Sequence, residues 1–318
     1  MITKETLFIL GAGASVPYGY PTGNELRNDI CRNFEERIVE LTKKDPEYSS
    51  LDVRQISKEA QKFTNVFFNS STPSIDLFLA RNRHFSEIGK KAIVLSILES
   101  EKNSRFRENM SDIKQDWYSY LFQKMAEDLS QPESYDHFDA NQVAFITFNY
   151  DRSLEHFLYE SLSNAFSSAP TDKIIKQLRS IQIFHVYGIV DKLPWQGGET
   201  EYGNDFTINS INEMENNIRL INERIHLDIR AMEVAMHNAS RFYFLGFGYA
   251  EENMDVLGIR RIFNGDQKIY GTAMGLSDKE ISEIRNYLSS NFRVKDSALN
   301  NPRIKRDVDC HKLLRDWL

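Results

Sequence analysis

The sequence predicts an α/β fold, a Rossmann-like parallel sheet with helices on both faces and a helical insertion. Short apolar runs of strand length recur along the chain, and longer stretches with apolar residues every three or four positions separate them. Helices cover both faces of a parallel sheet, so its strands read as nearly continuous apolar runs. The chain has 318 residues and is 41% hydrophobic, which is enough for one large core.

The apolar runs indicate where the strands lie. The first run begins at Leu7 and closes at Leu10, where it ends in a glycine turn. Further strands are expected at residues 142–147, 180–187, 241–245 and 267–272. The carboxyl ends of parallel strands meet at one edge of such a sheet, and ligands bind in the crevice there. The residues just after each strand are therefore the candidate site.

The helical patterns divide the chain into parts. Apolar residues recur at helical spacing over 23–41, 52–68, 75–99, 111–129, 211–238 and 278–288. We expect residues 1–45 and 136–290 to form a Rossmann domain, 46–135 to form a helical insertion, and 291–318 to be a C-terminal extension. The extension is expected to dock on the core through its closing apolar residues, Leu313, Leu314 and Trp317.

Charge and cysteine content narrow the function classes. Lysines and arginines total 39 against 46 aspartates and glutamates, which gives a net charge of −7 and a pI near 5.6. Without a positive field, no direct nucleic-acid binding is expected. Cys31 and Cys310 are far apart and indicate neither a disulfide framework nor a thiolate zinc site. No apolar run approaches the roughly 18 to 20 residues that span a bilayer, and no signal pattern begins the chain, so we expect a cytoplasmic protein without membrane contact.

The turn after the first predicted strand is Gly11-Ala12-Gly13-Ala14-Ser15. Glycines let a backbone turn sharply and approach a phosphate closely, because no Cβ intervenes. This predicts a nucleotide or dinucleotide as the ligand. A Gly-x-Gly turn also ends many ordinary strands, and Val16 stands where the Gly-x-Gly-x-x-Gly fingerprint has its third glycine.

Polar side chains follow the second predicted strand, which ends at Thr147. Asn149 and Asp151 come directly after it. An amide and a carboxylate at a strand end are candidates for substrate contact. Both residue types also cap helices and form Asx turns, which is the structural alternative.

The third and fourth predicted strands add further candidates. His185 and Tyr187 are expected on one face of the third strand, because side chains alternate with a period of two. A lone histidine in a strand is more often a hydrogen-bonded core group than a catalyst. The fourth strand ends in Gly246 and Gly248, and Asn253 follows soon after. One crevice can hold the residues that follow all four strands.

In their order and spacing these motifs resemble the sirtuin-like domains of the silent-information-regulator superfamily, in the branch found in bacterial antiviral defence. The resemblance covers residues 7–27 and about 143–275. It is carried by the first glycine turn with Pro21, Ile146-Thr147-Phe148-Asn149-Tyr150-Asp151, Phe184-His185-Val186-Tyr187-Gly188, Gly246-Phe247-Gly248 and, in the insertion, Ser74-Ile75-Asp76-Leu77-Phe78-Leu79.

The resemblance implies an NAD glycohydrolase, because members of that family bind NAD along this edge and cleave the bond between nicotinamide and ribose. The products would be nicotinamide and ADP-ribose, with NAD as substrate and no metal. Catalysis falls to Asn149 and His185, with Asp151 in support and Tyr187 as the alternative to the histidine. The NAD-binding residues that the resemblance implies are Gly11, Ala12, Gly13, Ala14, Ser15, Pro21, Thr147, Gly246, Gly248 and Asn253.

Three departures from the family pattern bear on this reading. Sirtuin deacylases carry a four-cysteine zinc module, which two cysteines cannot build, and this argues against protein deacylation. After Pro21 the family continues with an acidic residue, Phe and Arg, where this chain has Thr22-Gly23-Asn24. The family histidine directly precedes a glycine, a position that Tyr187 holds here, with His185 two residues upstream.

The resemblance also implies a biological role and partners. An unregulated NAD hydrolase would poison its host, so we expect an effector of anti-phage defence that depletes NAD on activation. It would act as a homo-oligomer or with a HerA-type hexameric ATPase. Two alternatives stay open: a sensor module that binds NAD or ADP-ribose without chemistry, and an NAD-dependent ADP-ribosyltransferase or deacylase.

Overall fold

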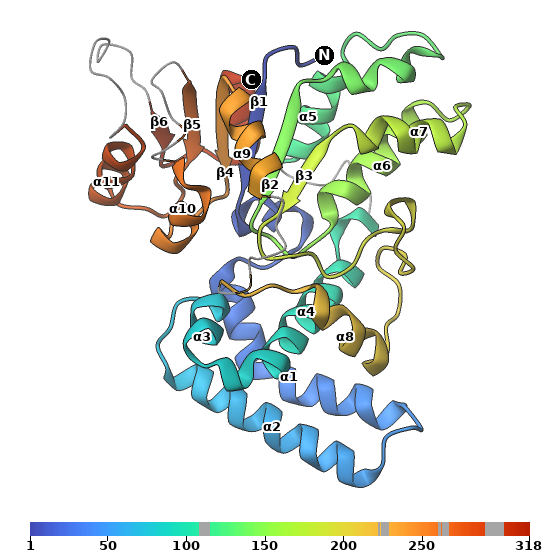
Figure 1. Cartoon of the computed structure of the whole chain (residues 1–318), viewed down its shortest axis with the longest axis vertical. Helices are drawn as coiled ribbons and strands as arrows, with labels where there is room; N and C mark the ends of the chain where they lie inside the picture. The colour runs from blue at the N-terminus through green and yellow to red at the C-terminus, as the bar shows by residue number, and fades with distance from the viewer. Residues whose placement is uncertain (108–114, 222, 224–228, 260–261, 263–266, 290–301) are drawn as a thin grey trace.

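Six strands of the computed structural model form one parallel sheet in the order β3-β2-β1-β4-β5-β6 (Figure 1). The structure describes residues 1–107, 115–221, 223, 229–259, 262, 267–289 and 302–318. The strands are β1 (Thr6–Leu10), β2 (Val143–Thr147), β3 (Gln182–His185), β4 (Arg241–Leu245), β5 (Lys268–Thr272) and β6 (Arg303–Lys305). This order confirms the predicted Rossmann-like α/β fold. The order reverses between β1 and β4, so the crevice of the fold lies where these two strands end.

The third strand is shorter than the sequence predicts. The apolar pattern covers 180–187, but β3 ends at His185, because Gly188 turns the chain with a φ of +80° and pairs with Ile218. The expectation that His185 and Tyr187 share a strand face is therefore wrong. β4 matches its predicted range, and β2 and β5 each begin one residue later than predicted.

Two layers of helices enclose the sheet (Figure 1). One layer holds α5 (Trp117–Ala126), α6 (Ser153–Ala165), α7 (Thr171–Arg179) and α12 (Cys310–Trp317), which pack side by side, with α12 against β5. The other layer holds α9 (Ile229–Asn238), α10 (Glu251–Leu257) and α11 (Asp278–Ser289). Right-handed crossovers place helices on opposite faces when the strand order reverses, so the two layers follow from the topology.

A row of aromatic rings crosses the sheet beneath α12. Phe8 lies in register with Phe145 and Tyr243, and Tyr243 with Tyr270, at ring distances of 5.1, 5.4 and 4.9 Å. The ring of Trp317 stacks on Tyr270 with 5.6 Å between the ring centroids. The Tyr243 hydroxyl donates a hydrogen bond of 2.6 Å to the Trp317 carbonyl. The closing residues of the chain therefore dock on the core, as the sequence predicts.

The last segment contributes more than a docking helix. β6 at Arg303–Lys305 pairs with β5 and completes the sheet, so the described part of the expected extension is integral to the Rossmann domain. The remainder of the expected extension, residues 291–301, lies outside the described residues.

A helical lobe lies beyond the carboxyl ends of the strands (Figure 1). It consists of α1 (Gly23–Lys44), α2 (Ser50–Asn69), α3 (Ile75–Arg81), α4 (Ser86–Lys102) and α8 (Ile208–Met214). α1 packs against α2 and α4, and α4 packs against α8. The lobe differs from the expected insertion over 46–135, since it begins with α1, includes α8 and excludes α5, which covers the sheet.

The single helix predicted over 211–238 is wrong. α8 ends at Met214, a 3-10 helix η8 (Glu215–Asn217) follows, and the buried Ile218 then pairs with Gly188, which takes the chain out of the predicted helix; α9 begins at Ile229. Residues 111–114, 222 and 224–228 of the predicted helices lie outside the described residues. Among the residues that are described, no helix combines the length and apolar character needed to cross a membrane.

The docking of α12 can be tested with a leucine truncation. Leu314 is fully buried, so Leu314→Ala is expected to lower the free energy of unfolding by about 2–5 kcal/mol through lost burial and a residual cavity. Leu51 of α2 is 70% exposed, and Leu51→Ala is the matched control with a change within about 0.5 kcal/mol. Urea unfolding of both variants measures the difference, and equal midpoints would contradict the docking.

Candidate functional site

The turns after β1 and β4 touch through their backbones. The Gly11 N–H donates to the Leu245 carbonyl and the Gly13 N–H to the Gly246 carbonyl, each at 3.0 Å. A Cβ on Gly11 would lie 2.6 Å from the Gly246 oxygen, and a Cβ on Gly246, whose φ is +57°, would overlap the Gly13 and Ala14 backbone. We call this the glycine contact. It joins the two halves of the sheet at the point where the strand order reverses.

The glycine contact gives the first turn a structural role besides the predicted phosphate binding. Four of the five N–H groups from Gly11 to Ser15 donate within the protein, those of Gly11, Gly13, Ala14 and Ser15. Ala14 is buried, and its carbonyl accepts the Trp117 indole N–H at 2.8 Å. Binding of a phosphate by this turn therefore stays a prediction, and so do the ligand roles of Ala12 and Ala14.

Asn149 is the central side chain of the crevice and is only 8% exposed. Its Nδ2 donates to the Gly11 carbonyl at 3.1 Å and to the Ser15 Oγ at 3.0 Å. The carbonyl can only accept, so it fixes which end of the amide is nitrogen. The Oδ1 is buried and has no hydrogen-bond partner among the described residues. An unpaired buried acceptor costs about 1–3 kcal/mol, so this oxygen would gain from a hydrogen-bond donor other than the described residues.

Asp151 lies behind Asn149 and has both carboxylate oxygens occupied. The Ser15 Oγ donates to Oδ2 at 2.9 Å, and the hydroxyl and N–H of Ser153 donate to Oδ1. Burial raises the pKa of Asp151, and the Ser153 and Ser15 hydrogen bonds partly offset that rise. The chain of donors runs from Asn149 through Ser15 to Asp151, so Asp151 holds the turn that carries Asn149.

His185 faces protein groups at both ring nitrogens. Nδ1 lies 3.2 Å from the Asn149 carbonyl oxygen and Nε2 lies 2.6 Å from Glu155 Oε1 on α6. Burial lowers the pKa of His185, but the Glu155 carboxylate outweighs burial, and the net pKa is raised above its ordinary value. The imidazole thus supports the loop that carries Asn149.

Tyr187 points to the opposite side, across the crevice. Its hydroxyl donates to Asn253 Oδ1 on α10 at 2.7 Å. Its ring packs edge-on to the ring of Phe148. The Phe148 ring in turn packs against Phe247, with 5.1 Å between the ring centroids. These rings are 3–7% exposed and form an aromatic cluster that fills the crevice between the ends of β2, β3 and β4.

The remaining predicted residues fall into different places. The Thr147 Oγ1 accepts the Asn149 N–H at 3.1 Å and so positions the amide. Gly248 is exposed with open space beside its Cα, which leaves room for a ligand there. Pro21 comes directly before Thr22, the N-cap of α1, and its predicted ligand role stays untested.

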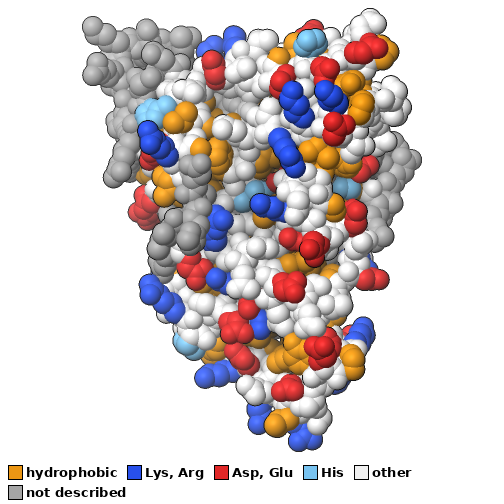
Figure 2. All heavy atoms as spheres, turned by 45° about the vertical axis from the view of Figure 1, so that its right-hand side comes forward, with side chains coloured by type: hydrophobic (Ala, Val, Ile, Leu, Met, Phe, Trp, Pro, Cys, Tyr) orange, Lys and Arg blue, Asp and Glu red, His pale blue; other side chains and the backbone are white. Residues whose placement is uncertain are grey.

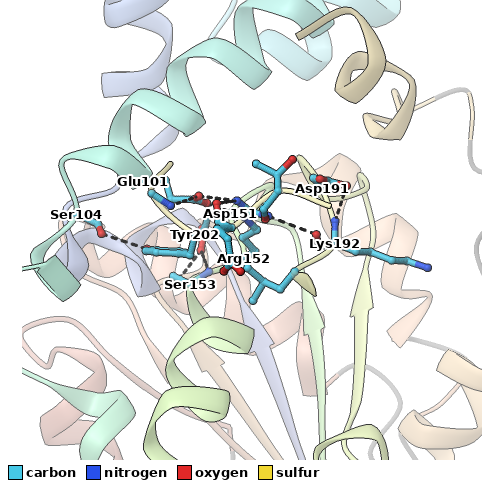
Figure 3. Close-up of polar contacts among 12 residues, drawn as sticks. Glu101, Ser104, Asp151, Arg152, Ser153, Asp191, Lys192 and Tyr202 are labelled. Carbon is cyan, nitrogen blue, oxygen red and sulfur yellow. Dashed lines mark hydrogen bonds and ion pairs between the residues drawn. The ribbon is translucent and has the colours of Figure 1, made fainter. Parts of the chain in front are cut away.

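A buried ion pair that the sequence analysis missed connects the helical lobe to the site (Figure 3). Arg152 binds Glu101 of α4 through Nε and Nη2, at 2.9 and 2.7 Å, and both side chains are at most 1% exposed. Arg152 also donates to the carbonyls of Thr200 and Glu201, so each partner is fully hydrogen-bonded. The pair holds α4 and the loop before α8 directly against the residue that follows Asp151.

Other missed residues are Ser153, Glu155 and Phe247. Ser153 and Glu155 lie in the first turn of α6, where a polar residue on a buried face was the available signal.

Over the described ranges, no cluster of three or more histidine, cysteine or acidic side chains could hold a metal ion. Acidic and basic side chains are intermingled over the face seen in Figure 2.

Comparison with known proteins leaves the site to be judged on its geometry. No protein-family model matches the chain, and no curated protein matches it.

The glycine contact makes a sharp prediction for two neighbouring glycines. Gly246→Ala is expected to lower the free energy of unfolding by at least about 3 kcal/mol, because the new methyl group meets backbone and the φ is positive. Gly248→Ala, two residues away in open space, is expected to change it by less than about 0.5 kcal/mol. Thermal and urea unfolding of the pair measure this, and two equally stable variants would show that the turns do not touch.

Proposed function

We propose that this chain is an NAD glycohydrolase that cleaves NAD to nicotinamide and ADP-ribose. The single observation that carries the proposal is the unpaired, buried Oδ1 of Asn149 at the reversal point of the sheet. The motif order that resembles sirtuin-like defence domains supplies the substrate class. A Rossmann-like fold by itself serves many chemistries, so the proposal rests on the site.

Cleavage of NAD needs no general acid, because the nicotinamide ring is positively charged in NAD and leaves as a neutral molecule. The protein has to stabilise an oxocarbenium-like ribose and place a water. The Asn149 Oδ1 can accept a hydrogen bond from a ribose hydroxyl or from that water without adding a charge. Ser15, Asp151 and Thr147 hold the amide in position. No group in this scheme needs a metal.

The proton from the attacking water needs an acceptor, and the geometry favours Tyr187 over His185 as the group beside the crevice. Tyr187 directs its hydroxyl across the crevice to Asn253, whereas both nitrogens of His185 face Glu155 and the Asn149 backbone. We assign His185 a positioning role. The Tyr187 hydroxyl would accept a hydrogen bond from the water and pass the proton to solvent, because the Asn253 amide is not basic enough to keep it.

One observation bears equally on the glycohydrolase and on the alternative of a binding module without chemistry. The aromatic cluster of Phe148, Tyr187 and Phe247 fills the crevice, so NAD can enter only if these rings move. The same observation suits an effector that stays closed until activated. We propose that the protein is such a closed effector of anti-phage defence in the cytoplasm. It would be activated by assembly into a homo-oligomer or by a HerA-type ATPase. Transfer of ADP-ribose to an acceptor other than water is the further alternative.

The central prediction concerns Asn149. Asn149→Ala is expected to abolish nicotinamide release from NAD, because it removes the only acceptor in the proposed scheme that awaits a ligand. Nicotinamide and ADP-ribose are both quantified after incubation of purified protein with NAD. A parallel incubation uses NAD labelled in its ADP-ribose part. Label recovered in free ADP-ribose indicates hydrolysis, and label recovered on another acceptor indicates transfer.

The matched control is Asn164→Ala, an exposed asparagine on α6 whose amide donates to Glu160. This variant is expected to keep parental activity. A folded Asn149→Ala protein with parental activity would remove Asn149 from the mechanism.

The roles of Tyr187 and His185 can be separated. Tyr187→Phe is expected to lower the rate by about two orders of magnitude, the usual contribution of a group that moves a proton, with the ring packing kept. His185→Gln is expected to lower it less, because glutamine can keep a hydrogen bond to the loop. Single-turnover rates of nicotinamide release measure both. An inactive His185→Gln beside an active Tyr187→Phe would reverse the assignment.

A further inference from the structure

A cavity of about 570 Å³ opens at the outer edge of β3, away from the crevice. β3 is the edge strand of the sheet, and its residues from Ile183 onward form one wall. The loop at Gly197 and Gly198 and the segment from Asn216 to Arg219 form the others. The volume is typical of a pocket for a small organic ligand, and it holds a mononucleotide.

The charged groups of this cavity define what it can bind. Lys192 and Arg219 supply two cations, and neither belongs to an ion pair formed by the described residues. Asp191 supplies one carboxylate, whose Oδ1 accepts the Lys192 N–H at 2.8 Å. Figure 3 shows the Lys192 side chain leading away from the Arg152–Glu101 pair, and so this cation is not used in that pair.

We propose that the cavity is a second binding site, for a phosphorylated sugar such as the ribose phosphate of a nucleotide. The two cations suit a phosphate group, since Arg and Lys are the side chains that bind phosphate oxygens most strongly. The remaining carboxylate oxygen of Asp191 accepts sugar hydroxyls. Gly197 has open space beside its Cα, so the ligand can lie against the backbone of this loop. The site goes beyond the proposed NAD cleavage and does not depend on it.

One residue belongs to both sites. His185 lines the cavity, and its Nδ1 lies 3.2 Å from the Asn149 carbonyl oxygen. A ligand in the cavity would therefore lie beside the residue whose imidazole supports the loop carrying Asn149.

Calorimetric titration of the full chain with AMP tests the site, with adenosine as the match that lacks the phosphate. AMP is expected to bind, and adenosine to bind at least about tenfold more weakly. Lys192→Ala and Arg219→Ala should each weaken AMP binding about tenfold or more. Lys192 is exposed and the Arg219 backbone N–H keeps its bond to Tyr187, so both variants should fold. Arg54→Ala, on the exposed surface of α2, removes the same charge elsewhere and should bind AMP like the parent.

Three results would overturn the proposal: no heat of binding with millimolar AMP, equal affinity for AMP and adenosine, or unchanged AMP affinity in both cavity variants. Nicotinamide release from NAD is measured on the same preparations. A parent chain that cleaves NAD but does not bind AMP refutes only the cavity site. AMP binding that Lys192→Ala and Arg219→Ala both weaken supports the cavity site, whether or not the isolated chain cleaves NAD.

Discussion

The backbone contact between the turns after β1 and β4 is the constraint on which the site depends. Gly11, Gly13 and Gly246 let two main chains meet where side chains would keep them apart. The contact fixes the Gly11 carbonyl, which in turn fixes the Asn149 amide at 3.1 Å. Ser15 extends the same turn to Asp151. The three glycines thus determine the geometry of the crevice, and the proposed role of Asn149 depends on that geometry.

The buried polar side chains next to Asn149 are paired, whereas the Asn149 Oδ1, like Trp195 Nε1, Glu215 Oε2 and Arg306 Nε farther away, has no partner among the described residues. Arg152 and Glu101 are buried as deeply as Asn149, yet the guanidinium and the carboxylate satisfy each other and nearby backbone groups. Leaving a charge of this pair alone would cost several kcal/mol, so the pair also ties the helical lobe to the site loop. The acceptor left open beside the reversal point of the sheet is the observation on which the proposed ligand contact rests.

The sequence predicts the sheet and the turns well, because apolar runs and glycine pairs are local signals. Asn149 and Gly246 could be placed at one edge from strand order alone. Four features could not be predicted. The ion pair of Glu101 and Arg152 joins residues 51 positions apart. β6 has only three residues, too few for a period to show. The partner of His185 depends on how α6 turns Glu155 toward β3, and the strand pattern near Tyr187 runs on past the real end at His185.

The most direct test of the central claim is a crystal structure of the chain with NAD bound. We expect the nicotinamide ribose, or a water beside it, to donate to the Asn149 Oδ1 at about 3 Å, with the rings of Phe148, Tyr187 and Phe247 displaced from the crevice. NAD bound elsewhere, with the Asn149 Oδ1 still unpaired and the aromatic cluster in place, would contradict it.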